Sequence, residues 1–150
     1  LARTNDAAAE CDFHALMGGP LEELELHRAY AAELGINLEH VIPNRACEAY
    51  TDFLLHTAWH TSPSETLAAM TPCMHLYAYL GAELAPALSD SHPYRRWIAT
   101  YSSREFSELA SRVEGLLDRL ATDTPAVRYC YRYAMQCELD FFSDVMEKPR

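Results

Sequence analysis

The chain can be arranged around one stretch of sequence, Met70-Thr-Pro-Cys-Met-His-Leu-Tyr-Ala-Tyr-Leu-Gly81. Cys73 and Tyr77 lie one helical turn apart in this stretch, so they share one face of a predicted helix. The same apolar face continues through Leu76, Leu80 and Leu84. The spacing therefore predicts an amphipathic helix that carries a thiol and a phenol on its inner face.

Pro72 stands directly before this cysteine and decides how the helix is built. Because proline lacks an amide hydrogen and clashes with the preceding turn, we expect the helix either to kink or to restart. In a restarted helix, Thr71 is the N-cap and Cys73 lies in the first turn. The positive end of the helix dipole then lowers the pKa of the thiol. A small buried core residue is the alternative interpretation of the same cysteine.

The composition is that of a globular protein. The chain has 150 residues, of which 49% are hydrophobic, and it carries a net charge of −10 without a basic face, which argues against a nucleic-acid partner. No signal peptide and no run long enough to span a membrane is visible. The 5 cysteines are odd in number and lack paired metal spacing. We therefore expect reduced thiols in a cytoplasmic protein.

Helical periodicity and helix-start signals occur throughout, and no segment alternates with period two. The pattern predicts an all-α protein with one domain over residues 1–150. The first expected helix covers residues 3–17 and is stopped by Gly18-Gly19, and the second is opened by Pro20, has an inner stripe of Leu21, Leu24, Ala31 and Leu34, and ends at Gly35. The third runs from Arg45 to His60, and the fourth is capped by Ser62 and fades around Pro86. A further helix begins at His92-Pro93 and restarts at a second capping box, Ser102-Ser103-Arg104-Glu105, and the last helix runs from Thr124-Pro125 towards Met146.

Glu138 is the second notable residue, because it is a carboxylate within the apolar stripe of the last predicted helix. A buried charge is costly, so either Glu138 has a partner or its pKa is raised. A carboxyl group that holds a proton near neutral pH can act as a general acid. A structural ion pair is the alternative, with Arg28, Arg45 or Arg128 as the candidate partner.

Nine tyrosines form the third notable feature. Tyr50, Tyr77 and Tyr101 each fall on the predicted inner face of a different helix, where phenols could either pack in the core or line a pocket for a flat heteroaromatic ligand.

Metal sites are only weakly indicated. The pair Glu23 and His27 and the series Asp52, His56 and His60 have spacings that permit chelation, but the same spacings are typical of solvated helix faces. We predict no metal site.

Five segments give the chain a resemblance to the TenA / thiaminase II family, which has a haem-oxygenase-like helical fold. The resemblance extends from about residue 22 to residue 142. The matching segments are Glu25-Leu-His-Arg-Ala-Tyr30, Ala49-Tyr-Thr51, Leu67-Ala-Ala-Met-Thr-Pro-Cys-Met-His-Leu-Tyr77, Pro93-Tyr-Arg-Arg-Trp-Ile-Ala-Thr-Tyr-Ser-Ser-Arg-Glu-Phe106 and Cys137-Glu-Leu-Asp-Phe-Phe142.

The resemblance implies an aminopyrimidine aminohydrolase that hydrolyses thiamin or aminomethyl-aminopyrimidine to hydroxymethylpyrimidine in thiamin salvage. It implies that Cys73 is the nucleophile and that Glu138 protonates the ring nitrogen of the substrate. The pocket would be lined by Tyr50, Tyr77, Tyr101 and the stacking rings of Phe141 and Phe142. The resemblance also implies a small pyrimidine substrate, no cofactor, and a homo-oligomer, by analogy a tetramer.

The chain departs from the family pattern in two places. The aromatic residue expected two positions after the cysteine is His75, which could titrate or could simply face another helix. The family's first helices, one of which supplies an aspartate to the pyrimidine amino group, have no counterpart before Leu1. We therefore expect that the 150 residues are a fragment or lack part of the pocket.

Two other functions are compatible with the sequence. A non-catalytic relative could use the same groove to bind a ligand or a partner. A di-iron oxidase of the same fold class could use Glu23, His27 and either Glu138 or Asp140 as ligands, but it would leave the thiol without a role.

Overall fold

The computed structural model describes residues 7–16 and 18–147, and this part of the chain forms helices and no strand. The helices are α1 (Ala7–Leu16), α2 (Gly18–Glu33), α3 (Arg45–His60), α4 (Pro63–Leu84), α5 (Arg95–Tyr101), α6 (Arg104–Leu120) and α7 (Pro125–Glu147), with short 3-10 helices η1 (Leu38–His40) and η2 (Ala85–Ala87). The predicted all-α class is confirmed. Of the first predicted helix, residues 3–6 and 17 lie outside the described residues.

Side-chain caps fix where several helices begin. Asn44 accepts a hydrogen bond from the Cys47 amide at the start of α3, and Ser62 forms the predicted capping box with Glu65 at the start of α4. Thr124 accepts from the Val127 amide at the start of α7. These three predicted helix starts are confirmed.

The predicted start of α6 at Ser102 is one residue early. Ser103 is the N-cap of α6, and its hydroxyl accepts from the Phe106 amide at 3.1 Å. The two adjacent serines offer equivalent hydroxyls, so sequence alone does not tell which one caps the helix.

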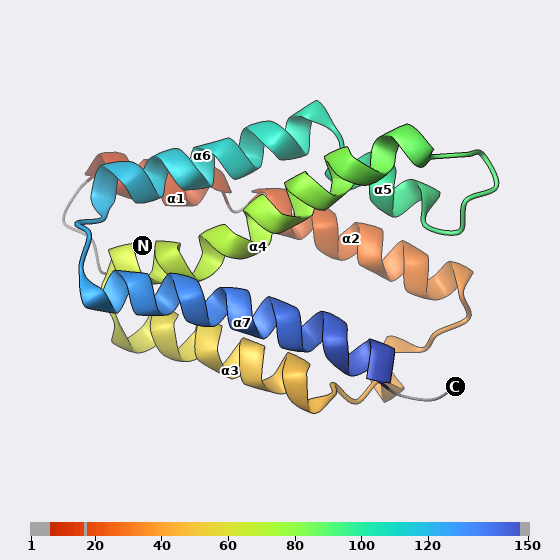
Figure 1. Ribbon diagram of the computed structural model, residues 1–150, viewed down its shortest axis with the longest axis horizontal. Coiled ribbons are helices and arrows are strands. Elements are labelled where there is room, and N and C mark those ends of the chain that lie inside the picture. The colour runs from red at the N-terminus through yellow and green to blue at the C-terminus, as the bar shows by residue number, and fades with distance from the viewer. Residues whose placement is uncertain (1–6, 17, 148–150) are drawn as a thin grey trace.

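Helix α4 crosses the middle of the molecule, with α5 and α6 on one side and α3 and α7 on the other (Figure 1). A core cluster forms where α4 meets α7, around Ala68, Ala69 and Cys130. The partly buried side chains packed on this cluster are Phe53, Leu54, Leu117, Val127 and Tyr131. Small residues at the centre let the α4 and α7 backbones approach closely, which brings the thiol stretch of α4 against the stripe of α7 that carries Glu138.

Pro72 does not restart α4, which is one continuous helix from Pro63 to Leu84. The Thr71 hydroxyl donates a hydrogen bond to the Leu67 carbonyl at 2.7 Å, as a helix-interior threonine does, and does not act as an N-cap. Pro72 itself and most residues of the turn before it are buried, and their packing offsets the single backbone hydrogen bond that proline removes. Cys73 therefore lies in a helix interior, and the predicted dipole effect on its thiol is wrong.

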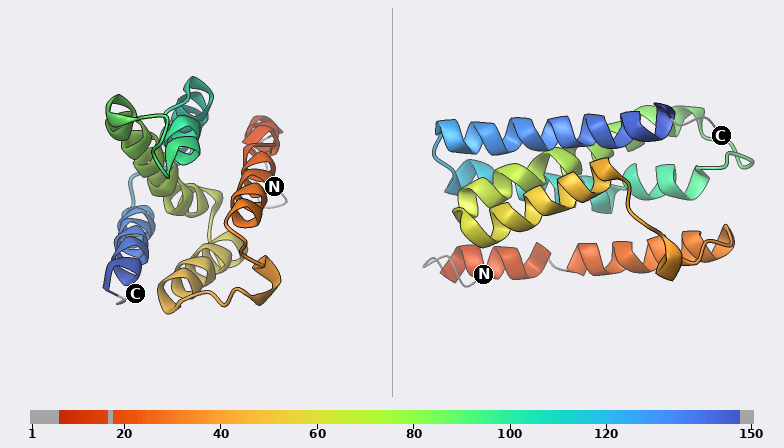
Figure 2. Two further views of the ribbon diagram at one scale, coloured as in Figure 1. Left: turned by 90° about the vertical axis from the view of Figure 1, so that its right-hand side faces the viewer. Right: turned by 90° about the horizontal axis from the view of Figure 1, so that it is seen from below.

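Helices α1 and α2 lie end to end along one side of the bundle (Figure 2). Helix α2 begins at Gly18, so Gly18-Gly19 starts this helix and does not only stop the one before it. Its predicted inner stripe is wrong for three of four residues, because Leu21, Leu24 and Leu34 are 61%, 51% and 74% exposed and Ala31 alone is buried. Outside α1, no helix in the described ranges packs closely along α2, so these leucines have no apolar partner surface.

The corner between α5 and α6 rests directly on α4. At Gly81 the α4 backbone is so close that a methyl group added there would lie 2.3 Å from the Tyr101 carbonyl carbon. Only glycine permits this approach without a shift of backbone atoms. Gly81 thereby sets how closely Tyr101, the last residue of α5, packs against α4.

Candidate active site

The thiol of Cys73 and the carboxylate of Glu138 face one another across the contact between α4 and α7. Glu138 is 2% exposed and Cys73 is partly buried. Burial raises the pKa of the Cys73 thiol well above its usual range, and the negative charge of Glu138, a hydrogen bond to that carboxylate and the charge of Glu23 raise it further. The thiol is therefore protonated at neutral pH, opposite to the predicted depression.

Tyr50 brings a third polar group to the same place from α3. Burial is the main reason that the pKa of Tyr50 is raised, followed by the charges of Cys73 and Glu138. Its hydroxyl is buried and has no hydrogen-bond partner of normal geometry among the described residues. The Glu138 carboxylate is nevertheless its neighbour, since hydrogen bonding to that carboxylate also raises the pKa of Tyr50.

Glu138 takes part in no ion pair within the described ranges. Two of the arginines considered as partners are engaged elsewhere, since Arg28 pairs with Glu25 and Arg128 pairs with Asp123. The polar groups that interact with Glu138 are instead the Cys73 thiol and the Tyr50 phenol. The carboxylate thus contacts groups that can exchange a proton with it.

Aromatic rings of α4, α5 and α7 contact one another near the Cys73–Glu138 pair. The Tyr77 ring centroid lies 5.0 Å from that of Tyr101, 5.6 Å from Trp97 and 6.1 Å from Phe142. Phe142 is in turn 5.6 Å from Phe141. Burial raises the pKa of Tyr77 most, and the nearby charges of Cys73 and Glu138 raise it further. Tyr50 and Tyr77 therefore lie close to the Cys73–Glu138 pair, and ring contacts link Tyr77 to Tyr101 and to Phe142, which in turn contacts Phe141.

Glu23 is a polar residue of this site that sequence analysis did not assign to it. The Tyr101 hydroxyl donates a hydrogen bond to the Glu23 carboxylate, across 78 positions of sequence. His27 Nε2 lies 3.6 Å from the same carboxylate oxygen. From their spacing, Glu23 and His27 were considered only as a possible metal-chelating pair. No local sequence pattern indicates that Glu23 bonds to Tyr101.

A cavity of about 360 Å³ opens beside Glu23, between α2 and the α5–α6 corner. Its wall includes Gly19, Glu23, Leu26, Thr100, Ser103 and Phe106. Cys73 and Glu138 do not line this cavity. Glu23 therefore connects an accessible hollow to the buried Tyr101.

The residues considered for metal binding do not gather into a ligand set. No group of three or more His, Cys, Asp or Glu side chains in the described part of the chain could hold a metal ion, so the ligands considered for the alternative di-iron oxidase do not form a cluster. The rings of His56 and His60 stack 4.7 Å apart on α3. The Nδ1 atom of His75 contacts the Glu114 carboxylate of α6, so this side chain faces another helix, as one of the two interpretations expected.

Residues 1–148 match the model of the TENA/THI-4/PQQC family, and the chain belongs to this family. It is 38% identical, over 78% of its length, to an aminopyrimidine aminohydrolase of Halalkalibacterium halodurans. It is 37% identical, over 81% of its length, to the mitochondrial bifunctional TH2 protein of Arabidopsis thaliana. A TenA homologue from Pyrococcus furiosus superposes on 81% of the chain with a TM-score of 0.73 and 28% identity. The predicted haem-oxygenase-like helical fold is confirmed.

The chain spans only part of these relatives. It covers 55% of the Halalkalibacterium protein, 24% of the Arabidopsis protein and 61% of the Pyrococcus chain. In the described ranges, no helix has the length and apolar character that a bilayer crossing requires.

Proposed function

We propose that this chain carries the thiol and the acid of an aminopyrimidine hydrolase of the thiaminase II kind. The substrate would be thiamin or aminomethyl-aminopyrimidine, and the product would be hydroxymethylpyrimidine. The observation that carries this proposal is the pairing of the Cys73 thiol with the buried Glu138 carboxylate, with the phenols of Tyr50 and Tyr77 close by. A pyrimidine is flat and electron-poor, and it fits between phenol and phenyl rings.

The raised pKa of Cys73 suggests how the thiol is activated. A thiol that is neutral in the empty site can pass its proton to Glu138 as the sulfur adds to a ring carbon. Glu138 then delivers that proton to a ring nitrogen, so the negative charge that arrives with the sulfur is neutralised on the ring. The electron pair of the ring nitrogen then expels the side-chain ammonium group as ammonia and leaves a methylene carbon. Water adds to this carbon and loses a proton. The ring nitrogen returns its proton to the sulfur through Glu138 as the carbon–sulfur bond breaks, which restores the aromatic ring and the thiol. Over the cycle one water is consumed and one ammonia is released.

The aromatic residues would hold the substrate during these steps. Tyr77, Phe141 and Phe142 offer ring faces and edges, and Tyr50 offers a hydroxyl. Tyr101 completes the wall on the side of α5.

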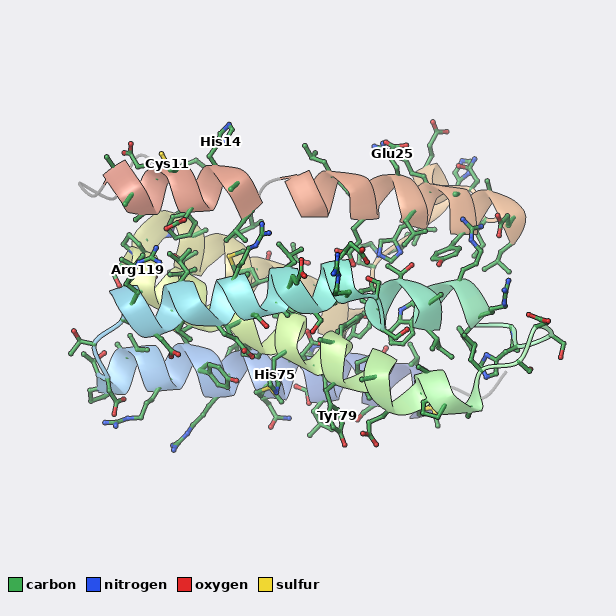
Figure 3. All side chains as sticks on the ribbon, turned by 90° about the horizontal axis from the view of Figure 1, so that it is seen from above. Cys11, His14, Glu25, His75, Tyr79 and Arg119 are labelled. Atoms are coloured by element: carbon green, nitrogen blue, oxygen red, sulfur yellow. The ribbon has the colours of Figure 1, made fainter. Side chains whose placement is uncertain are left out.

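Release of ammonia from aminomethyl-aminopyrimidine tests the proposal. We expect turnover by the unmodified chain, no turnover by Cys73→Ala, and unchanged turnover by Cys11→Ala, because Cys11 is exposed on α1 and faces away from the bundle (Figure 3). Equal ammonia release by Cys73→Ala and the unmodified chain would remove the thiol from the reaction.

A ligand-binding role without turnover is the second candidate. It is favoured by the raised pKa of Cys73, since a protonated thiol is a weak nucleophile. Tight binding of hydroxymethyl-aminopyrimidine, with no ammonia release from the amine, would support it.

The protein's setting is also part of the proposal. We infer a cytoplasmic homo-oligomer, a tetramer by family resemblance, in which residues 1–150 are one domain. The exposed leucines of α2 are consistent with contact between subunits.

A further inference from the structure

A second hollow, of about 410 Å³, lies on the exposed face of the first turns of α7. This α7 hollow is lined by Pro125, Arg128, Tyr129, Arg132, Tyr133 and Gln136. None of these residues belongs to the candidate active site, and Tyr129 precedes Glu138 by nine positions, which is about 13 Å along the helix axis. The volume of the α7 hollow is in the range of small-molecule sites.

Two tyrosines give the α7 hollow a flat aromatic wall. Tyr129 and Tyr133 are one helical turn apart, and their rings stack with centroids 5.7 Å apart and planes 17° apart. Phe53 of α3 contacts the Tyr133 ring edge to face at 4.7 Å, which holds that ring in place. Tyr129 is 61% exposed, so this wall is open to a ligand with a flat ring.

Two arginines bring positive charge to the same hollow. Arg128 and Arg132 are also one turn apart, so their guanidinium groups share one side of α7. Arg132 has no carboxylate partner among the described residues. Arg128 pairs with Asp123 at 2.8 Å, but both side chains are largely exposed, so this pair is weak and can give way to another anion. A guanidinium group binds phosphate oxygens through paired hydrogen bonds.

The α7 hollow differs in charge from the cavity beside Glu23. No acidic side chain lines the α7 hollow, although the chain carries a net charge of −10. The cavity beside Glu23 has two carboxylates in its wall, those of Glu23 and Glu105. An anion is therefore attracted to the α7 hollow and repelled from the cavity beside Glu23.

The same charges disfavour contact between two copies of the chain at this place. A twofold axis through the α7 hollow would set Arg128 and Arg132 of one copy against the same residues of the other. Like charges that face one another across an interface cost binding free energy. The two arginines therefore favour an anionic ligand over a second copy.

We propose that the α7 hollow binds a small aromatic compound that carries a phosphate group. Arg128 and Arg132 hold the phosphate, and the ring of the ligand lies against the rings of Tyr129 and Tyr133. The proposed hydrolase uses none of these residues, so the α7 hollow is a second site with a ligand of its own.

Calorimetric titration with phenyl phosphate tests the site, with inorganic phosphate and phenol as the two parts of that ligand. Phenyl phosphate should bind at least about tenfold more tightly than either part, because it uses both the arginines and the rings. In NMR spectra it should shift the backbone amide signals of residues 128–136 and leave those of residues 67–77, around Cys73, unchanged. Cytidine 5′-monophosphate, which has a ribose between ring and phosphate, shows by its relative affinity which kind of aromatic phosphate fits.

Two substitutions separate the two halves of the site. Arg132→Gln should weaken binding of phenyl phosphate and of inorganic phosphate about tenfold and leave binding of phenol unchanged. Tyr129→Leu should weaken binding of phenyl phosphate and of phenol and leave binding of inorganic phosphate unchanged. Both side chains are exposed, so both variants should fold, and thermal unfolding checks that they do.

Arg112→Gln and Tyr79→Leu are the matched controls. Arg112 is an exposed arginine of α6 that also has no carboxylate partner in the described ranges. Tyr79 is an exposed tyrosine of α4 that points away from the bundle (Figure 3). Both control variants should bind phenyl phosphate as the unmodified chain does.

Each outcome has a distinct meaning. Shifts in residues 128–136, with the expected losses in Arg132→Gln and Tyr129→Leu, support the proposal. Shifts confined to residues 67–77, an equal loss in Arg112→Gln, or phenyl phosphate that binds no more tightly than inorganic phosphate overturn it. Tighter binding of an acidic peptide with a tyrosine than of phenyl phosphate overturns the small-molecule assignment. The proposed hydrolase is tested separately, by ammonia release.

Discussion

Helices α4 and α7 are joined by buried apolar surface, whereas α2 leaves leucines exposed and is joined to α5 by polar side chains. On α4, Leu67, Ala68 and Ala69 are at most 1% exposed. On α2, Leu21 and Leu24 are more than half exposed, and so is Leu34 just after the helix. The two regions have similar helical sequence patterns but differ in whether another helix covers their apolar face.

Specific polar contacts join α1 to α6 and α2 to α5. Arg119 of α6 pairs with Asp12 of α1, and Arg96 of α5 pairs with Glu33 of α2. The Arg96 guanidinium also lies 4.8 Å above the centre of the Tyr30 ring. The candidate site draws on both regions, because its thiol and acid come from α4 and α7 and its Glu23 comes from α2. The candidate site therefore combines residues from a buried and from a more exposed part of the molecule.

The sharpest test of this difference compares two leucines in helices. Leu67→Ala should lower the free energy of unfolding by about 2–5 kcal/mol, because it leaves a cavity at a fully buried position of α4. Leu24→Ala on α2 should change it by less than about 1 kcal/mol, since that side chain is 51% exposed. Urea unfolding of both variants measures the two values. Equal losses would mean that α2 is as firmly packed as α4.

A pair of glycines tests the contact that positions Tyr101. Gly81→Ala should destabilise the protein by about 1–3 kcal/mol, because the added methyl group meets the backbone of Tyr101 and Ser102. Gly115→Ala in α6 is the control, since a methyl group there meets nothing within 4 Å. It should stabilise the helix by up to about 1 kcal/mol. Thermal unfolding would contradict this account if both substitutions shifted the midpoint in the same direction.

Loss of the polar bonds to α2 should have the smallest effect. Arg96→Ala removes an ion pair and a cation–π contact, both at the surface, so we expect a loss of up to about 1 kcal/mol. Hydrogen exchange should become faster in α2 and remain unchanged in α7. Arg104→Ala is the control, because its partner Glu108 lies in the same helix. Faster exchange throughout the molecule would show that α2 and the core open together.

The helices and the burial of Glu138 could be predicted from the sequence alone. Caps are local, so Asn44, Ser62 and Thr124 could be identified without knowledge of the fold. A carboxylate among apolar residues at helical spacing indicates burial in the same way.

The features that sequence analysis missed depend on distant parts of the chain. Periodicity shows that the leucines of α2 share a face, but not whether another helix covers that face. The continuity of α4 through Pro72 depends on packing against neighbouring helices, and so does the raised pKa of Cys73. The bond between Tyr101 and Glu23 joins two helices with no local signal in either.

The central claim is that Glu138 and Cys73 act as a pair that shares a proton, and Glu138→Gln tests it most directly. The anionic carboxylate raises the pKa of the thiol, so its neutral amide should lower that pKa and increase the thiolate fraction, about tenfold for each unit of pKa. Alkylation of Cys73 by iodoacetamide at mildly alkaline pH should therefore become faster in this variant while ammonia release falls strongly. Unchanged alkylation together with unchanged ammonia release would contradict the account.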